Sequence, residues 1–263
     1  MQISNRQIIL TGAASGIGQA LLTKLSNYPC QILATDIDAA RLDDAVNALG
    51  NTRATIYCFT GDLAQPAEID RLLAEAVKRI GGCDLCFANA GFAYYEAIGA
   101  ADWAHIERIF QLNTFSPIYT LLRLRELNPQ RPYRVVVTAS AMAKFGLPGY
   151  ALYSATKAAL DCFADAYRYE LAPRGRLAVV YPAATRTNFF RAASADQPPI
   201  PWPSQSPEQV AGAIIRGVER GQNAIFPAAA FRWTWKLGEV FPPLRIGYQV
   251  WQQRVLARFL GKR

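Results

Sequence analysis

Short apolar segments alternate with amphipathic segments along most of the chain. The short segments are apolar nearly throughout, which is typical of strands whose two faces are both covered by helices. The longer segments carry apolar residues at a spacing of three and four, which indicates helices. The predicted strands are residues 7–10, 31–35, 54–58, 85–88, 134–138, 177–181 and 224–226. The predicted helices include residues 39–49, 66–80, 102–112, 153–171 and 207–220.

This alternation of strands with single helices predicts an α/β fold. Strands connected in this way pair in parallel through right-handed crossovers, so that helices cover both faces of the sheet. The expected architecture is a doubly wound parallel sheet of about seven strands, whose ligand lies beyond the carboxyl ends of the strands. The chain contains no internal repeat and no linker that would divide it, so residues 1–227 are expected to form one domain.

Length and composition fit a globular protein of this class. The chain has 263 residues, of which 51% are hydrophobic. No apolar run reaches the roughly 18 residues that a membrane-spanning helix needs, and the first predicted strand leaves no room for a signal peptide. Five cysteines, an odd number, fit a reducing compartment better than a disulfide framework. These features predict a cytoplasmic protein.

One pair of cysteines, Cys83 and Cys86, has the Cys-x-x-Cys spacing of some metal and redox sites. The pair falls in the segment GCDLCFANAG, which is predicted to be a strand. Residues three apart on a strand point to opposite faces, whereas a zinc or redox pair needs both sulfurs on one side. We therefore expect structural cysteines and no metal site.

A glycine-rich turn, TGAASGIG at Thr11 to Gly18, joins the first predicted strand to a helix. Glycine inside a helix costs about 1 kcal/mol relative to alanine, so its use here needs a reason. Free N–H groups at a helix start, aligned with the positive end of the helix dipole, bind a pyrophosphate when no side chain blocks its approach. The spacing of Gly12, Gly16 and Gly18 in this context predicts a dinucleotide site.

An acidic residue, Asp36, ends the second predicted strand. A carboxylate at that point can accept hydrogen bonds from both ribose hydroxyls of NAD and would repel the 2′-phosphate of NADP. No Lys or Arg stands directly before Gly16, where the residue is Ser15, or directly after Asp36, where it is Ile37. The predicted cofactor is therefore NAD.

A tyrosine and a lysine four residues apart, Tyr153 and Lys157, share one face of a predicted helix. Free tyrosine has a pKa of about 10, and a lysine ammonium beside a nicotinamidium cation would lower that pKa. Tyr153 could then exchange a proton with an alcohol or a carbonyl as the general acid/base. Ser140, in the loop after the fifth predicted strand, is placed to hydrogen-bond the same substrate oxygen.

Together these motifs resemble the short-chain dehydrogenase/reductase family over about residues 5–227. The motifs are TGAASGIG, Asp36, GDL at Gly61–Leu63, ANAG at Ala88–Gly91, Asn113, Ser140 and YSATK at 153–157. The resemblance implies a single Rossmann-fold domain of seven strands that binds a nicotinamide cofactor. It also implies hydride transfer between the nicotinamide and a substrate carbon, here expected in a secondary alcohol or ketone.

The resemblance further implies roles for individual residues. Asp62 would lie near the adenine, and Asn89 would border the cofactor and steady the central strand. Asn113 would hold a water that joins Lys157 to a proton relay. The expected catalytic residues are Asn113, Ser140, Tyr153 and Lys157. The expected cofactor-binding residues are Gly12, Ser15, Gly16, Ile17, Gly18, Asp36, Asp62, Leu63, Asn89, Ala90, Gly91, Tyr153, Lys157, Pro182 and Thr187, the last holding the nicotinamide carboxamide.

A Pro-rich segment, residues 188–206, is predicted to form a lid over the substrate. It follows the sixth predicted strand and ends at Ser206-Pro207, a helix N-cap and N1 pair. Apolar side chains of the lid and of the opposite loop would line a pocket for a hydrophobic alcohol or ketone, such as a steroid-, retinoid- or lipid-like molecule; the alternative is that they only pack the lid onto the body. These side chains are Phe145, Leu147, Tyr150, Phe189, Phe190, Ile200 and Trp202.

The C-terminal extension, residues 228–263, is basic and aromatic. From Gly221 onward the chain has seven Lys or Arg and one acid, Glu239. A basic amphipathic helix with Trp and Phe is typical of a membrane-surface anchor; packing on the same domain or on a partner subunit is the alternative. Nucleic acid is not expected as a partner, because the charge is confined to the extension and no binding motif accompanies it. The predicted apolar face comprises Leu244, Tyr248, Trp251, Val255 and Phe259, with Leu256 and Leu260 off it.

Two functions from different classes fit these features. The favoured one is an NAD-dependent oxidoreductase acting on CH–OH groups, because a protein that only senses NAD has no need for an acid/base pair. The other is a non-catalytic NAD-binding regulatory protein that associates with a partner or a membrane. The resemblance also implies a homodimer or homotetramer that assembles through two long helices, one of them residues 153–171.

Overall fold

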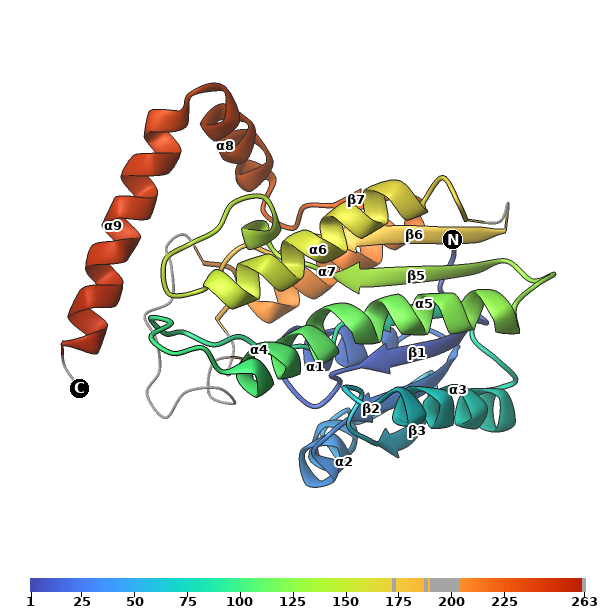
Figure 1. The fold of residues 1–263 in the computed structure, drawn as a ribbon. Coiled ribbons are helices and arrows are strands. Elements are labelled where there is room, and N and C mark those ends of the chain that lie inside the picture. The colour runs from blue at the N-terminus through green and yellow to red at the C-terminus, as the bar shows by residue number, and fades with distance from the viewer. Residues whose placement is uncertain (172–173, 187–188, 190–203, 262–263) are drawn as a thin grey trace.

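The fold is built on one parallel sheet of seven strands, seen in a computed structural model that describes residues 1–171, 174–186, 189 and 204–261 (Figure 1). The strand order is β3-β2-β1-β4-β5-β6-β7, and every neighbouring pair is parallel. This confirms the predicted doubly wound sheet. The strand order reverses between β1 and β4. The chain leaves β1 toward one face of the sheet and leaves β4 toward the other, and this opens a crevice at the carboxyl ends of the two strands. The strands are β1 (Gln7–Thr11), β2 (Gln31–Asp36), β3 (Thr55–Thr60), β4 (Leu85–Ala88), β5 (Tyr133–Thr138), β6 (Gly175–Val180) and β7 (Ala224–Ile225).

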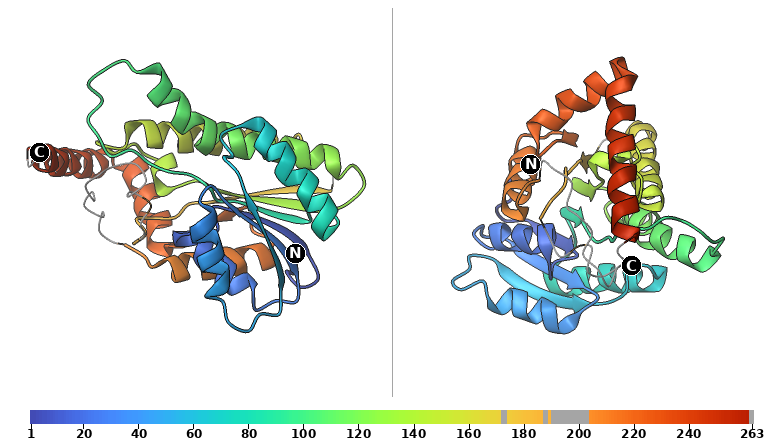
Figure 2. Two further views of the ribbon diagram at one scale, coloured as in Figure 1. Left: turned by 90° about the horizontal axis from the view of Figure 1, so that it is seen from below. Right: turned by 90° about the vertical axis from the view of Figure 1, so that its left-hand side faces the viewer.

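Helices cover both faces of the sheet, as the views in Figure 2 show. The face that includes Ile8, Leu10 and Ile32 packs against α1 (Gly16–Leu25), α2 (Ala39–Asn47) and α7 (Pro207–Glu219). The face that includes Ile9, Leu33 and Val135 packs against α3 (Pro66–Ile80), α5 (Ser116–Leu127) and α6 (Ala151–Tyr167). Because alternate strand residues enter opposite cores, the strands are apolar nearly throughout.

One connection differs from the simple strand–helix pattern. Between β4 and β5 the chain forms α4 (Trp103–Phe110), a π-helical turn η1 (Gln111–Phe115) and α5 in direct succession. π-Helical turns within α-helices frequently occur at functional sites, and this one carries Asn113.

The two thiols of the Cys-x-x-Cys pair lie together, so the prediction that they face opposite sides is wrong. Cys83 precedes β4 and is not part of it, because the strand begins only at Leu85. Both cysteines belong to the core that faces α3, α5 and α6, and burial raises the pKa of the Cys83 thiol. Among the described residues, no group of three or more His, Cys, Asp or Glu side chains could hold a metal ion.

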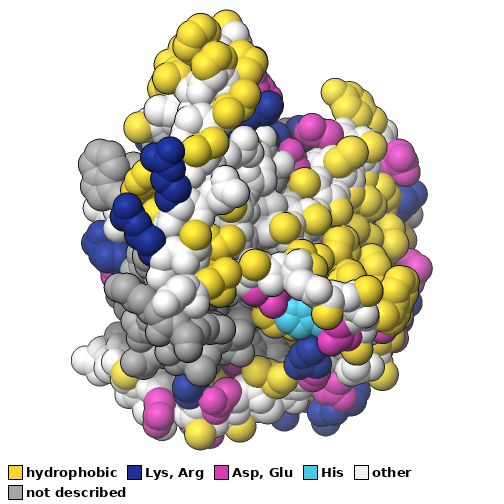
Figure 3. Space-filling model, turned by 60° about the vertical axis from the view of Figure 1, so that its left-hand side comes forward, with side chains coloured by type: hydrophobic (Ala, Val, Ile, Leu, Met, Phe, Trp, Pro, Cys, Tyr) yellow, Lys and Arg dark blue, Asp and Glu magenta, His cyan; other side chains and the backbone are white. Residues whose placement is uncertain are grey.

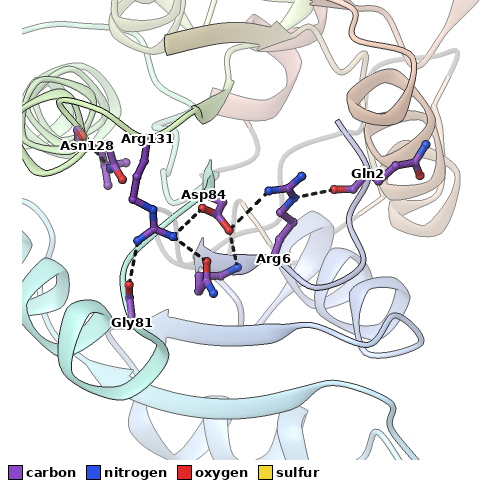
Figure 4. Close-up of polar contacts among 8 residues, drawn as sticks. Gln2, Arg6, Gly81, Asp84, Asn128 and Arg131 are labelled. Atoms are coloured by element: carbon purple, nitrogen blue, oxygen red, sulfur yellow. Dashed lines mark hydrogen bonds and ion pairs between the residues drawn. The ribbon is translucent and has the colours of Figure 1, made fainter. Parts of the chain in front are cut away.

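A polar network fastens the amino ends of β1 and β4 (Figure 4). The buried Asp84 carboxylate accepts a hydrogen bond from the Gln7 backbone N–H at 3.2 Å and an ion-pair contact from Arg131 at 3.2 Å. Arg6 approaches the same carboxylate at 4.0 Å. Arg131 also donates to the Gly81 carbonyl at 3.2 Å. Strand β1, the turn before β4 and the turn before β5 are therefore joined at the edge opposite the crevice.

The C-terminal extension forms a helical hairpin of α8 (Ala229–Val240) and α9 (Pro242–Leu260). Helix α9 contacts the domain through Tyr248, Leu256 and Phe259, which join a third cluster around the residues after β4 and before α6, and Gln252 of the same helix is also buried. The predicted apolar face is therefore wrong in part. Leu256 is the most buried apolar residue of α9, because the contacting face follows a spacing of four from Tyr248. Within the described part of the chain, no helix combines the length and the apolar character needed to cross a membrane.

Candidate active site

A cavity of about 1290 Å³ lies at the carboxyl ends of the strands. Ordinary small-molecule pockets measure about 300–1,000 Å³, so this cavity has room for a large ligand together with a second molecule. Its lining runs from the glycine-rich turn and Asp36 at one end, past Tyr153 and Lys157, to α8 and α9 at the other.

The glycines of the turn have two different roles. Gly12 and Gly16 line the cavity with φ values of +67° and +53°, which disfavour residues with a side chain. Gly18 does not line the cavity, contrary to its predicted contact with the cofactor. A Cβ atom on Gly18 would lie 1.7 Å from the Gly12 carbonyl oxygen, so this glycine is needed for close packing of α1 on the turn. The turn is thus an open cradle at a helix N-terminus, which suits a pyrophosphate.

The strand ends beside this cradle are tied together by hydrogen bonds. The Thr11 hydroxyl accepts from the backbone N–H groups of Asn89 and Ala90, both at 2.9 Å. Asn89 donates to the Thr11 carbonyl at 3.3 Å, and its side-chain oxygen accepts from the Thr138 hydroxyl at 3.2 Å. One asparagine therefore links β1, β4 and β5 where the crevice opens.

Asp36 lies at the rim of the cavity with its carboxylate held by the backbone. One oxygen accepts from the Ala14 N–H at 3.0 Å, and the other accepts from the Ile37 N–H at 2.9 Å. The second oxygen also accepts from the Asp38 N–H at 3.3 Å, so it is the first oxygen that retains a lone pair for a further hydrogen bond. Arg41 also lines this end of the cavity and pairs with Asp38 at 3.3 Å.

Tyr153 and Ser140 meet in the middle of the cavity. Tyr153 lies in the first turns of α6, and Ser140 follows β5. The Ser140 oxygen accepts from the Met142 N–H at 3.1 Å, which orients the serine hydroxyl. Burial raises the pKa of Tyr153 to about 12, and a hydrogen bond with Ser140 opposes that effect. Burial therefore outweighs the expected influence of Lys157 on the phenol in the protein alone.

Lys157 lies one turn after Tyr153 on the same face of α6. Its ammonium group donates to the Thr138 carbonyl at 2.9 Å and lies 5.7 Å from the centre of the Tyr153 ring. Burial lowers the pKa of Lys157 to about 7. Gly91 leaves room for the neighbouring Asn113, since a Cβ at position 91 would lie 2.9 Å from the Asn113 side-chain oxygen.

Asn113 lies behind the cavity and does not line it. Its side-chain oxygen accepts from the Phe92 N–H at 3.0 Å, and its amide donates to the Phe92 carbonyl at 2.8 Å. A further hydrogen bond of 3.2 Å reaches Thr156, next to Lys157. The asparagine side chain thereby joins the π-helical turn, the loop after β4 and α6.

Most of the remaining predicted cofactor residues line the same cavity, namely Ser15, Ile17, Asp62, Leu63, Asn89, Ala90, Gly91 and Pro182. Asp62 lies 3.8 Å from Arg108, which also faces the cavity. Thr187 and most of the predicted lid, including Phe190, Ile200 and Trp202, lie outside the described residues.

The far end of the cavity is apolar. Phe145, Leu147 and Phe189 line it as predicted, whereas the buried Tyr150 lies behind Tyr153 and does not line it. Sequence reasoning missed the contribution of the C-terminal hairpin to this lining. The hairpin residues include Phe231, Trp235, Leu237, Leu244, Tyr248 and Trp251. Their concentration of aromatic residues was the available signal, but the local pattern does not reveal which part of the chain they meet.

The site fits a nicotinamide dinucleotide in shape and in donor groups. A cradle that only glycine can form stands at a helix start, a backbone-held carboxylate stands at the rim, and a phenol and an ammonium group face the same cavity. These features define an oxidoreductase of the Rossmann class.

Comparison with known proteins gives the family. The model of the short chain dehydrogenase family matches residues 6–198, and the chain belongs to this family. An uncharacterized oxidoreductase of Escherichia coli strain K12, YbbO, is 30% identical over 193 residues, which cover 72% of this chain and 69% of that protein.

Two solved structures of short-chain dehydrogenases share the fold. One from Burkholderia phymatum, in complex with NAD, has a TM-score of 0.81 at 18% identity and covers 93% of this chain and 96% of its own. One from Sphingobium yanoikuyae, in complex with NADPH, has a TM-score of 0.75 at 22% identity and covers 92% and 94%. Membership of this family makes the chain a nicotinamide-dependent oxidoreductase. Of the two solved structures, one contains NAD and the other NADPH.

Replacing the buried Lys157 by Met is expected to show the energetic cost of its burial. The folded pKa of about 7 lies below the unfolded value of about 10.4, so the unfolded state binds more protons between these pH values. Stability of the wild-type protein therefore rises from pH 7 toward pH 10, and a methionine removes this dependence. The gain in unfolding free energy of Lys157→Met over wild type should be roughly 3–4 kcal/mol larger at pH 7 than at pH 10.

Urea denaturation at the two pH values measures this difference. Lys78→Met is the matched control, because that lysine is exposed on α3 and its substitution should shift stability equally at both pH values. A Lys157→Met effect that is the same at pH 7 and pH 10 would contradict the buried, weakly basic lysine.

Proposed function

We propose that the protein is an NAD-dependent oxidoreductase that interconverts a hydrophobic secondary alcohol and its ketone. The observation that carries the proposal is the convergence of Tyr153, Ser140 and Lys157 on the cavity that begins at the glycine cradle. A nicotinamide held in this cavity would supply or accept the hydride. Its positive charge in the oxidised form would oppose the effect of burial on the Tyr153 pKa.

The protein residues then move and hold the proton. Tyr153 donates its proton to the ketone oxygen during reduction and recovers it from the alcohol during oxidation. The Ser140 hydroxyl hydrogen-bonds the same substrate oxygen. Lys157 holds the nicotinamide ribose and, when protonated, stabilises the phenolate. Asn113 fixes the loop after β4 through Phe92 and positions α6 through Thr156.

The choice of NAD over NADP is supported by the rim of the cavity. The Asp36 carboxylate keeps a lone pair available for a ribose hydroxyl, and its charge would repel a 2′-phosphate. Arg41 lines the cavity and pairs with Asp38 at 3.3 Å.

A hydrophobic substrate is supported by the apolar end of the cavity. A series of secondary alcohols and ketones of increasing apolar size, read by NADH absorbance, tests this choice. We expect kcat/KM to rise about fourfold per added methylene that the cavity buries, since each is worth about 0.8 kcal/mol. Phe145→Ala should flatten this dependence, because the ring lines the apolar end. A preference for the smallest substrates would contradict the assignment.

We also propose that the protein forms a homodimer or homotetramer through α5 and α6. Phe115, which directly precedes α5, and Leu122 on α5 present exposed apolar side chains on the outer surface of that layer. Assembly through this surface would leave the cavity open, because the cavity lies at the carboxyl ends of the strands.

A further inference from the structure

We propose that the α8–α9 hairpin docks the protein on an anionic lipid bilayer. The turn between the two helices, around Phe241 and Pro242, projects beyond the rest of the molecule at the top of Figure 1 and of the right-hand view of Figure 2. Hydrophobic side chains gather at this end of the molecule in Figure 3, and Lys and Arg side chains lie below them on the same face.

The hairpin carries a higher concentration of exposed apolar side chains than the rest of the described chain. Eight large ones are exposed between residues 233 and 251, and Val240, at 82% exposure, is the most exposed of them. The remainder of the described chain, about six times longer, exposes another eight. The hairpin set comprises Trp233, Leu237, Val240, Phe241, Leu244, Ile246, Val250 and Trp251.

Basic side chains accompany this apolar set. On α9, Val250, Arg254 and Arg258 follow one another at a spacing of four, so they lie on one side of the helix. All three are exposed, so this side faces away from the domain. Among the hairpin side chains that the structure describes, the exposed cations are Lys236, Arg245, Arg254 and Arg258, against the single exposed acid Glu239. Apolar and aromatic insertion flanked by cations is the combination that binds the interface of an anionic membrane.

A second copy of the chain suits this surface less well. Two identical hairpins would bring the same excess of positive charge together, and like charges repel. A stable dimer also needs about 800 Å² of buried surface per partner, whereas the outer end of the hairpin is a narrow projection.

The docking surface continues into the cavity. Leu244 and Trp251 belong both to the exposed apolar set and to the cavity lining. Docking would therefore place the apolar end of the cavity beside the acyl chains. The idea that a hydrophobic substrate enters there rests on the proposed function; the docking itself does not.

Vesicle flotation of the full chain tests the docking. With phosphatidylcholine vesicles that contain about 30% phosphatidylglycerol, wild-type protein is expected to float, and about 1 M NaCl, where the screening length is about 3 Å, should weaken binding. The tip variant Val240→Asp/Phe241→Asp should lower the partition coefficient roughly tenfold or more. The matched control Val77→Asp/Ile98→Asp alters side chains that are similarly exposed elsewhere and should float like wild type.

A charge variant provides an independent readout. Arg254→Gln/Arg258→Gln leaves the tip intact and should lower the partition coefficient on the anionic vesicles about tenfold while reducing the effect of salt. Wild-type protein that stays at the bottom of the gradient, or a tip variant that floats like the control, would overturn the proposal. So would a tip variant whose mass by light scattering without lipid is lower than that of wild type, because the hairpin would then be a contact between copies.

Turnover separates this proposal from the proposed function. The tip variant should retain wild-type turnover of a soluble ketone, because neither of its positions lines the cavity. Loss of flotation with intact turnover supports docking independently of the reaction.

Discussion

Replacing Tyr153 by Phe is expected to lower kcat by about 10³-fold or more while the dissociation constant for NADH stays within about twofold of the wild-type value. The substitution removes one oxygen atom and keeps the ring, so the packing around α6 is preserved. What is lost is the group that exchanges a proton with the substrate oxygen. Cofactor affinity persists because the glycine cradle and Asp36 lie at the other end of the cavity.

Steady-state kinetics and NADH fluorescence titration measure the two quantities on the same preparation. The control is Tyr167→Phe, at the far end of the same helix, where the hydroxyl accepts a hydrogen bond from Arg125 at 3.0 Å and faces no cavity. Its turnover should match wild type. If Tyr153→Phe also turns over normally, the acid/base mechanism is rejected, and a non-catalytic NAD-binding role becomes the better explanation.

The second large effect is expected at Asp36, which should set the choice between the two cofactors. Wild-type protein should show a kcat/KM for NADH at least about 10²-fold above that for NADPH, since a hydrogen bond to the 2′-hydroxyl is gained and a charge repulsion with the 2′-phosphate is avoided. Asp36→Ala should reduce this ratio about 10²-fold, mostly by weakening the use of NADH and partly by admitting the 2′-phosphate.

Measuring kcat/KM with both cofactors checks the expectation. Asp44→Ala is a suitable control, because this exposed carboxylate on α2 lies outside the cavity lining and its loss should leave the ratio unchanged. A wild-type protein that uses NADPH as well as NADH would refute the role assigned to Asp36.

The sheet could be predicted because each of its strands is marked by a pattern within a few consecutive residues. A buried parallel strand needs a continuous apolar run, and such runs mark all seven strands, with β4 beginning and ending at the predicted residues. The helices were harder at their ends. α6 ends at Tyr167, four residues before its predicted end. α5 was not among the predicted helices, because its apolar residues are spread around the helix: Leu121 and Leu124 are buried, whereas Leu122 is exposed.

The candidate site divides in the same way. Gly12, Gly16, Asp36, Tyr153 and Lys157 could be found because each belongs to a short motif whose chemistry depends on neighbours in sequence. The apolar end of the cavity could not, because it depends on where the C-terminal hairpin returns to the domain.

Long-range packing also determines the roles of individual residues that the spacing of apolar residues in the sequence does not predict. Leu256 contacts a site near Gly149, more than one hundred positions earlier in the chain, and no local pattern encodes that meeting. The requirement for glycine at position 18 is also a matter of packing. A side chain there would clash with the Gly12 carbonyl oxygen, so the glycine is needed for this contact rather than for a ligand.

The anchoring of Asp84 has a consequence for how such a chain can change over time. Its carboxylate holds the starts of two central strands and the turn before a third, a full strand length away from the reacting groups. Loops at the opposite edge can therefore be lengthened, shortened or exchanged without breaking the hydrogen bonds and ion pairs of Asp84. A protein arranged in this way can acquire new substrates while its central sheet stays unchanged.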